Sequence, residues 1–167
     1  GICFNSISNF EDAIKMFSEA TKLNSNYSEA FYNLGSVQKK IGRFQVSIAS
    51  YKRAIQITPN YIDAHNNLGN IYKDLGLFNE AIESYEWAIS YGPNYTIAHM
   101  NLASIYSSYD LEKALQHYQK AISIEPNFPE AHYSLGTVYS SLGQKDESKK
   151  SYEKALEIKP DYAEAHN

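Results

Sequence analysis

Apolar side chains recur at steps of three and four residues through most of the chain, and residues 62–92 show the pattern most clearly. A first apolar stripe ends at Gly76, which can take the left-handed conformation that terminates a helix, and a second ends before Pro93, which cannot continue one. Steps of three and four place side chains on one face of a helix. The pattern therefore predicts two amphipathic helices joined by a short turn. The stripe positions are Ala64, Leu68, Ile71, Tyr72 and Leu75, then Phe78, Ala81, Ile82, Tyr85, Ala88 and Ile89.

This predicted helix pair recurs along the chain at intervals of 33 or 34 residues, as the spacing of Leu34, Leu68, Leu102 and Leu135 shows. A period of this length is typical of a solenoid, in which each unit buries its apolar face against its neighbours. We expect both ends to interrupt a repeat, so that the sequence is part of a longer array. The predicted units are the end of a first repeat at 1–25, complete repeats at 28–61, 62–95, 96–128 and 129–162, and the start of another at 163–167.

The positions that recur in register are small, aromatic and proline residues. In the repeat at 62–95 they are His65, Leu68, Gly69, Tyr72, Ala81, Tyr85 and Pro93. This pattern resembles the tetratricopeptide repeat family over essentially the whole chain. The resemblance implies an all-α fold, a right-handed superhelix (an α-α solenoid) of antiparallel helix pairs. It also implies a protein–protein interaction scaffold whose concave groove, lined by the first helix of each pair, binds an extended peptide or protein segment.

An amide or hydroxyl side chain directly precedes the Leu-Gly or Leu-Ala pair of each repeat, at a position that faces the groove in this family. A carboxamide carries both donors and an acceptor, so it can pair with a peptide group. Equivalent helices about 10 Å apart match about three residues of extended chain. We therefore predict binding of a peptide backbone largely without regard to its sequence. The predicted ladder is Asn33, Asn67, Asn101 and Ser134, and the flanking candidates are Ser36, Asn70, Ser104, Thr137, Lys73 and Asp74.

Two other interpretations of this ladder stay open. It is similar to the asparagine ladder of O-linked N-acetylglucosamine transferase, which implies an alternative function as the substrate-recognition arm of such a glycosyltransferase, with its catalytic domain outside this sequence. Alternatively, an Asn-rich chain simply places amides on a solvated face. A carboxylate-binding subclass of the family is disfavoured, because its cationic residues are absent at the corresponding positions, which are Tyr32, Ser36, Asn67, Ile97 and Asn101.

A histidine also recurs at one position of the repeat and invites a metal-binding interpretation. Ligands to one zinc ion lie about 2 Å from it, whereas equivalent helices lie about 10 Å apart, so these histidines cannot share an ion. We predict that they are packing residues, as are the recurring tyrosines, and that Trp87 is a packing or outer-face residue. His117 has no partner that the sequence assigns. The recurring histidines are His65, His99, His132 and His166.

Local signals add three expectations about helix ends and contacts. Asn26, Asn60 and Asn127 each stand three residues before an acidic residue, which predicts N-terminal capping by their side chains. Asp110 replaces the helix-ending glycine in the third repeat, so we expect it to form the turn there and cap the next helix. The small residues Gly35, Gly69, Ala103 and Gly136 are expected to meet Ala54, Ala88, Ala121 and Ala155 across each helix pair.

The fourth repeat has a more polar second helix, because Lys145, Ser148 and Lys149 stand where the second repeat has Phe78, Ala81 and Ile82. We expect this helix to be less firmly docked, since it buries less apolar area.

Composition argues against several other classes of protein. The net charge of −4 and scattered lysines disfavour nucleic-acid binding, including RNA binding by a related repeat with a basic groove. No apolar run approaches the roughly 18 residues of a membrane span, and the single Cys3 forms no internal disulfide. No nucleophile–base pair, phosphate-binding glycine loop or acidic metal cluster appears. We therefore expect a protein or peptide partner, no membrane partner, no active site, cofactor or metal in this chain, a cytoplasmic or nuclear location, and end-to-end self-association through apolar ends.

Overall fold

The computed structural model describes the backbone of residues 2–162 and the side chains of residues 9–162. All regular secondary structure in this range is helical, which confirms the all-α prediction. The helices are α1 (Ile2–Leu23), α2 (Ser28–Lys40), α3 (Phe44–Ile57), α4 (Ile62–Asp74), α5 (Phe78–Tyr91), α6 (Thr96–Tyr106), α7 (Leu111–Ile124), α8 (Pro129–Ser141) and α9 (Lys145–Ile158).

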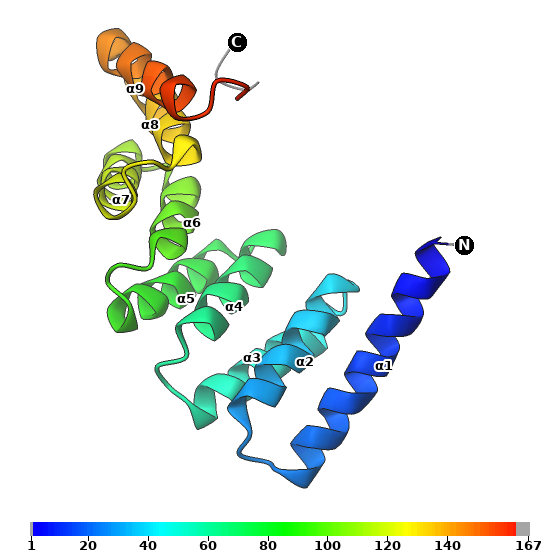
Figure 1. Cartoon of the computed structure of the whole chain (residues 1–167). Helices are drawn as coiled ribbons and strands as arrows, with labels where there is room; N and C mark the ends of the chain where they lie inside the picture. Colours follow the sequence, from blue (N-terminus) through cyan, green and yellow to red (C-terminus); the bar gives the residue numbers. More distant parts are fainter. Residues whose placement is uncertain (1, 163–167) are drawn as a thin grey trace. The chain divides into compact units, whose positions relative to one another are not determined.

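The helices form two compact units, Gly1–Tyr91 and Gly92–Asn167. In the first unit α2 packs against α3 and α4 against α5, and the pairs are joined by contacts of α1 with α2 and of α3 with α4 (Figure 1). In the second unit α6 packs against α7 and α8 against α9, and α7 contacts α8. Each unit is therefore a stack of consecutive helix pairs, as the solenoid prediction requires.

Each of three helix pairs closes around a glycine on its first helix, and the residue opposite is a tyrosine. A Cβ built on Gly69 would lie 2.6 Å from the Tyr85 ring, and one on Gly136 would lie 2.7 Å from Tyr152. The tyrosine ring is thus the nearest neighbour of each of these glycine positions, and the sequence prediction, which named alanines as partners, did not assign it. The four alanines, Ala54, Ala88, Ala121 and Ala155, are fully buried.

The turns within the pairs follow the sequence signals. Gly42, Gly76 and Gly143 have φ angles of 74–75°, in the left-handed region that favours glycine. In the third repeat Asp110 accepts a hydrogen bond from the Lys113 backbone N–H at 3.0 Å, which confirms its predicted capping role. The chain before it is wound tightly by bonds between residues three apart, such as that from the Tyr109 N–H to the Tyr106 carbonyl.

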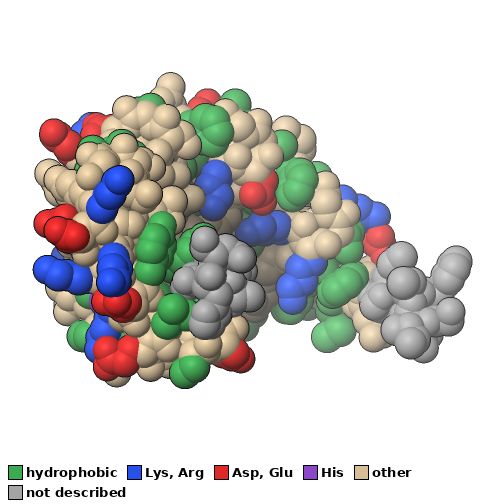
Figure 2. Space-filling model, turned by 90° about the horizontal axis from the view of Figure 1, so that it is seen from above, with side chains coloured by type: hydrophobic (Ala, Val, Ile, Leu, Met, Phe, Trp, Pro, Cys, Tyr) green, Lys and Arg blue, Asp and Glu red, His purple; other side chains and the backbone are tan. Residues whose placement is uncertain are grey.

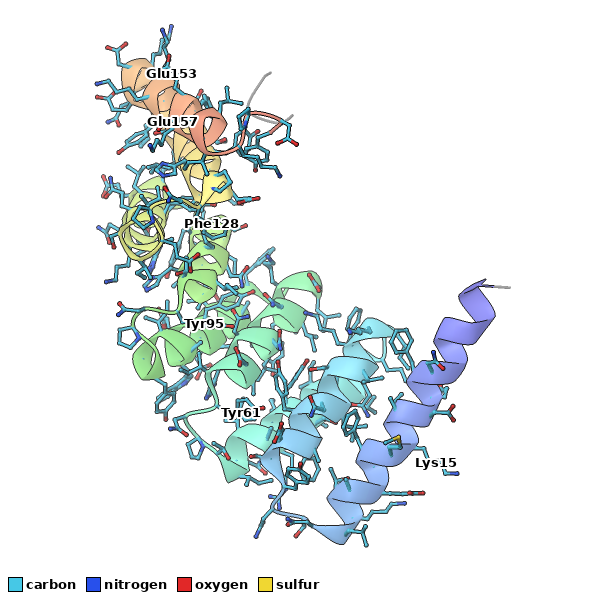
Figure 3. The ribbon with its side chains drawn as sticks, viewed as in Figure 1. Lys15, Tyr61, Tyr95, Phe128, Glu153 and Glu157 are labelled. Atoms are coloured by element: carbon cyan, nitrogen blue, oxygen red, sulfur yellow. The ribbon has the colours of Figure 1, made fainter. Side chains whose placement is uncertain are left out.

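The predicted asparagine caps are wrong, because the N-cap of each helix is the residue that follows the asparagine. Helices α2, α4, α6 and α8 have aromatic N-cap residues that make no side-chain capping bond. Figure 3 labels three of them, Tyr61, Tyr95 and Phe128. The aromatic ring contributes packing instead, and Tyr61 stacks on Tyr32 with ring centroids 4.9 Å apart. The acidic residues Glu29, Asp63 and Glu130 do lie in the first turns, where they complement the helix dipole. The N-cap residues are Tyr27, Tyr61, Tyr95 and Phe128.

Helix α1 is continuous from Ile2 to Leu23. Residues 2–23, which the sequence predicted to belong to the end of a first repeat, thus form one helix without an internal turn. The segment contains no glycine to reverse the chain as Gly76 does after α4. The predicted start of a further repeat at 163–167 lies outside the described residues.

Helix α9 is docked largely through polar side chains. Its buried residues are Ser148, Ser151 and Ala155, whereas α5 buries Ala81, Ser84, Tyr85 and Ala88. The Ser148 hydroxyl donates to the Gly136 carbonyl at 2.8 Å, and Ser47 makes the same bond to Gly35 in the first unit. None of the described helices combines the length and hydropathy needed to cross a membrane.

Candidate functional site

The predicted ladder residues lie on the first helices of the pairs, with Asn33 on α2, Asn67 on α4, Asn101 on α6 and Ser134 on α8. All four side chains are half-buried. Each of them is therefore partly accessible to solvent. Because the ladder is divided between the two units, its two halves are described separately.

In the first unit the structure brings Ser36 and Asn67 together in one cavity of about 310 Å³. The Asn67 amide donates to the Tyr32 hydroxyl at 3.1 Å, which anchors it across from α2. The Ser36 hydroxyl lies 3.0 Å from the hydroxyl of Tyr51, a buried residue whose pKa is raised to about 12 by burial. The remaining walls of this cavity, which we call the first polar cavity, are Lys39 and Lys40.

Sequence reasoning missed Lys39 and Lys40. They follow Ser36 by three and four residues on the same helix, and this spacing is the signal that could have found them. Burial lowers the pKa of the Lys39 ammonium, while Asp74 raises it and Lys73 lowers it. The predicted residues Lys73 and Asp74 therefore act electrostatically on this region, although they are not part of the cavity wall.

The second unit contains an equivalent cavity of about 240 Å³, here called the second polar cavity. It brings together three predicted residues, Ser104, Ser134 and Thr137. Ser104 and Ser134 stand at the repeat positions of Ser36 and Asn67. Sequence reasoning missed the rest of the wall, which is Ser107, Leu111, Tyr118, Tyr133, Val138 and Ser141.

The remaining candidates are placed outside these two cavities or have a second role. The Tyr85 hydroxyl donates to Asn70 Oδ1 at 2.7 Å, so Asn70 supports the buried tyrosine of its own helix pair. Thr137 combines both roles, since it lines the second polar cavity and accepts a hydrogen bond from the Tyr152 hydroxyl at 3.3 Å. Asn33 and Asn101 do not belong to either wall.

The recurring histidines share one structural role in the described residues. The Nε2 atoms of His65, His99 and His132 lie 2.8, 3.2 and 2.9 Å from the carbonyl oxygens of Pro59, Pro93 and Pro126. Each histidine thus fixes the loop that enters its own helix, while His166 lies outside the described residues. His117 also has a partner that the sequence did not reveal, the Nδ1 atom of His99 at 3.1 Å.

Charged side chains of both signs occur on the surface of the molecule. On the face drawn in Figure 2, acidic and basic side chains lie interspersed. Among the described side chains, no three His, Cys, Asp or Glu residues are placed to share a metal ion. Stacked helix pairs with polar cavities between their first helices define a helical-repeat protein of the scaffold class.

Sequence comparison places the chain in a known family. A TPR repeat model matches residues 4–42, 40–76 and 110–143, and tetratricopeptide repeat models match residues 62–95 and 129–162. The chain belongs to the tetratricopeptide repeat family. No curated protein matches the sequence significantly.

Solved structures of tetratricopeptide repeat proteins share the fold. MamA is 29% identical with a TM-score of 0.86, and the match covers 95% of this chain and 94% of MamA. TTC0263, a thermophilic protein of Thermus thermophilus, is 25% identical with a TM-score of 0.70, and the match covers 99% and 91% of the two chains. YrrB, described as having an unusual peptide-binding site, is 21% identical with a TM-score of 0.79 and coverage of 98% and 85%. At that identity YrrB shows the fold alone.

Proposed function

We propose that the first-helix face of this chain binds an extended peptide or protein segment, largely through the backbone of the ligand. The observation that carries this proposal is the repetition of one polar cavity. Equivalent positions, Ser36 with Asn67 and Ser104 with Ser134, line a cavity in each unit. Polar side chains recur at these positions, while neighbouring positions recur as apolar. A polar surface repeated in this way suits a ligand that is itself periodic, and an extended peptide is such a ligand.

The chemistry of the first polar cavity suits a peptide group. Asn67 is oriented by its bond to Tyr32, so little side-chain freedom is lost on binding. Its carboxamide oxygen can accept from a ligand N–H, and the Lys39 ammonium can donate to a carbonyl. The alternative, that these repeats are the substrate-recognition arm of a glycosyltransferase, stays a prediction from the asparagine ladder.

The proposal is tested with an array of peptides about ten residues long, followed by measurement of affinity for the best binder. Asn67→Ala combined with Ser134→Ala is expected to raise Kd about tenfold, as expected for one or two lost hydrogen bonds. Asn79→Ala, at an exposed position of α5, is the matched control and should leave Kd unchanged.

Two altered peptides distinguish recognition of the ligand backbone from recognition of its side chains. N-methylation at alternate peptide bonds is expected to abolish binding, whereas a scrambled sequence should bind with similar affinity. If scrambling abolishes binding and the Asn67/Ser134 variant binds normally, the backbone-binding proposal is wrong.

A further inference from the structure

Trp87 on α5 is held rigidly on one side and exposed on the other. Its ring stacks on His65, with centroids 6.3 Å apart, and on Tyr91, with centroids 5.9 Å apart. His65 is itself fixed by its bond to the Pro59 carbonyl. Nevertheless 48% of Trp87 is exposed to solvent. A large aromatic surface is thus presented in a fixed position.

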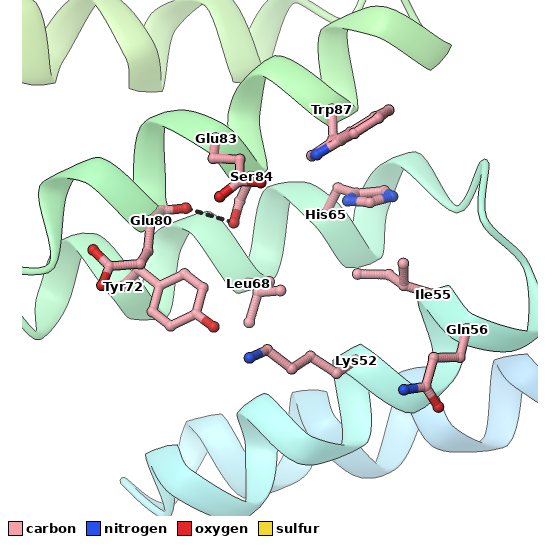
Figure 4. A pocket seen from close by; sticks show the side chains of 10 residues that line it. All are labelled: Lys52, Ile55, Gln56, His65, Leu68, Tyr72, Glu80, Glu83, Ser84 and Trp87. Carbon is pink, nitrogen blue, oxygen red and sulfur yellow. Dashed lines mark hydrogen bonds between the residues drawn. The ribbon is translucent and has the colours of Figure 1, made fainter.

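Carboxylates line the same cavities as this exposed ring. One cavity, of about 400 Å³, lies between α3, α4 and α5 and is lined by Glu80, Glu83 and Trp87 among others (Figure 4). A second, of about 350 Å³, is lined by Glu83, Glu86, Trp87 and Ser90. Glu83 and Trp87 therefore belong to both cavities. We call Glu80, Glu83, Glu86 and Trp87 the acidic-aromatic surface.

The carboxylates of this surface are not engaged in ion pairs. None of the ion pairs found among the described residues involves Glu80, Glu83 or Glu86. Lys52 lines the opposite wall of the larger cavity, but its ammonium lies over the Tyr72 ring, 5.8 Å from the centroid. The surface is consequently acidic where Trp87 is exposed.

Comparison of the repeats shows that packing does not require this arrangement. The other repeats have Arg53, Lys120 and Lys154 at the position of Trp87. Phe31 stands at the repeat position of His65. Arg53 packs over Phe31, with its guanidinium 5.9 Å from the Phe31 ring centroid. At the position of Glu83 the other repeats have Ala49, Gln116 and Lys150. A cationic side chain at the Trp87 position is therefore compatible with the packing of the helix pair. The acidic-aromatic surface is peculiar to one repeat.

We propose that the acidic-aromatic surface binds a lysine or arginine side chain on a segment of a partner protein. Tryptophan is the aromatic side chain that binds cations best, and an arginine stacked on Trp87 would place its donors beside Glu83 and Glu86. The larger cavity uses His65, Leu68 and Tyr72, which share one side of α4, whereas Asn67 lines the first polar cavity from another side. This surface therefore binds independently of the peptide site proposed above.

The test uses Trp87 as its own reporter, because it is the only tryptophan in the chain. The probe is an acetylated, amidated peptide of alternating arginine and alanine, and its control has citrulline, the uncharged analogue, in place of arginine. The arginine peptide is expected to change Trp87 emission saturably, with a Kd at least about tenfold lower than that of the citrulline peptide. Equal affinity of the two peptides, or no change in emission, would overturn the proposal.

Variants that copy residues of the other repeats test the location of the site. Trp87→Arg installs the residue that the first complete repeat has at this position, and Glu83→Gln installs that of the third repeat. With a fluorescently labelled arginine peptide, Trp87→Arg is expected to raise Kd at least about tenfold, and Glu83→Gln combined with Glu86→Gln about fivefold. Circular dichroism checks that both variants stay folded. If Trp87→Arg does not fold, the variant at the exposed glutamates still tests the proposal.

Matched controls distinguish this site from general attraction to an acidic protein. Glu112→Gln and Glu153→Gln remove charges from exposed positions of α7 and α9 and should leave Kd unchanged. An equal loss of affinity in these controls would show non-specific attraction and overturn the proposal. Sedimentation without peptide provides a further check: self-association abolished by Trp87→Arg would identify a second copy of this chain as the occupant and also overturn it.

Discussion

The Nδ1 atoms of His99 on α6 and His117 on α7 lie 3.1 Å apart and join the two helices of one pair. His99 Nε2 lies 3.2 Å from the Pro93 carbonyl oxygen and must donate to it, because a carbonyl only accepts. In a neutral His99 ring Nδ1 is then the acceptor, so His117 Nδ1–H is the donor. The bond thus requires at least one of the two rings to stay neutral, because two protonated rings would both donate. Burial lowers the pKa of His99, and burial together with His99 and Lys113 lowers that of His117 to about 4.

This histidine pair predicts a loss of stability at mildly acidic pH. The pKa of His117 falls from 6.5 to about 4 on folding, so between these values the unfolded chain binds more protons than the folded one. The stability that the folded protein gains from a neutral His117 is fully present above pH 6.5 and is lost as the pH falls toward 4. Because solvent screens the partly exposed His117 ring, we expect the free energy of unfolding to fall by about 2 kcal/mol, less than the full pKa change would give. Urea unfolding at several pH values measures it.

The effect of His117 is separated from general acid denaturation by substitution. His117→Gln keeps a donor toward His99 but does not titrate, so its stability should depend less on pH than that of the parent protein. His132→Gln, at a histidine that bonds to the Pro126 carbonyl, is the control and should keep the parent slope. Identical slopes in all three proteins would contradict the prediction.

The contact of Gly69 with Tyr85 predicts an unusual response to alanine. Alanine favours a helix by up to about 1 kcal/mol relative to glycine, but a Cβ at Gly69 would lie 2.6 Å from the ring of the fully buried Tyr85. Overpacking costs about 1–3 kcal/mol, so Gly69→Ala should lower the free energy of unfolding. Gly35→Ala, whose Cβ would lie 3.0 Å from Tyr51, should cost less. Denaturant unfolding of both variants tests the order, and equal stability would contradict it.

The capping geometry predicts different outcomes for two polar residues that look alike in sequence. Asp110 accepts the Lys113 N–H and caps α7, so Asp110→Ala should cost about 1 kcal/mol of stability. Asn60 precedes the actual N-cap of α4, Tyr61, which has no side-chain capping bond, so Asn60→Ala should be nearly neutral. Thermal unfolding of the two variants checks this. A comparable loss at Asn60 would restore the asparagine cap that the sequence suggested.

The polar interface of α9 predicts uneven backbone protection. Residues 145–158 bury Ser148, Ser151 and Ala155, whereas residues 78–91 bury the larger Tyr85 and two alanines. Less buried apolar area lowers the cost of local opening. Amide hydrogen exchange followed by mass spectrometry should therefore be faster at 145–158 than at 78–91. The opposite order would show that the serine hydrogen bonds hold α9 as firmly as apolar packing does.

Sequence reasoning succeeded where a structural feature depends on neighbouring residues along the chain. The helix pairs, the glycine turns and the capping role of Asp110 all follow from local spacing. It failed at the asparagine caps, because the residue that follows each asparagine is the N-cap. It did not assign the tyrosine rings opposite the glycines, because Tyr85 stands on the second helix of the pair, far along the chain from Gly69.

The sequence by itself thus determined the repeat, its helices and the polar positions of the first helices, because hydrophobic periodicity and turn residues act over a few positions. Only the tertiary structure decided which side chains meet. The pairing of His99 with His117, the cavity shared by Asn67 and Lys39, and the exposure of Trp87 above His65 depend on how helices are apposed. That apposition is set by packing over whole helix faces, and no local pattern of residues specifies it.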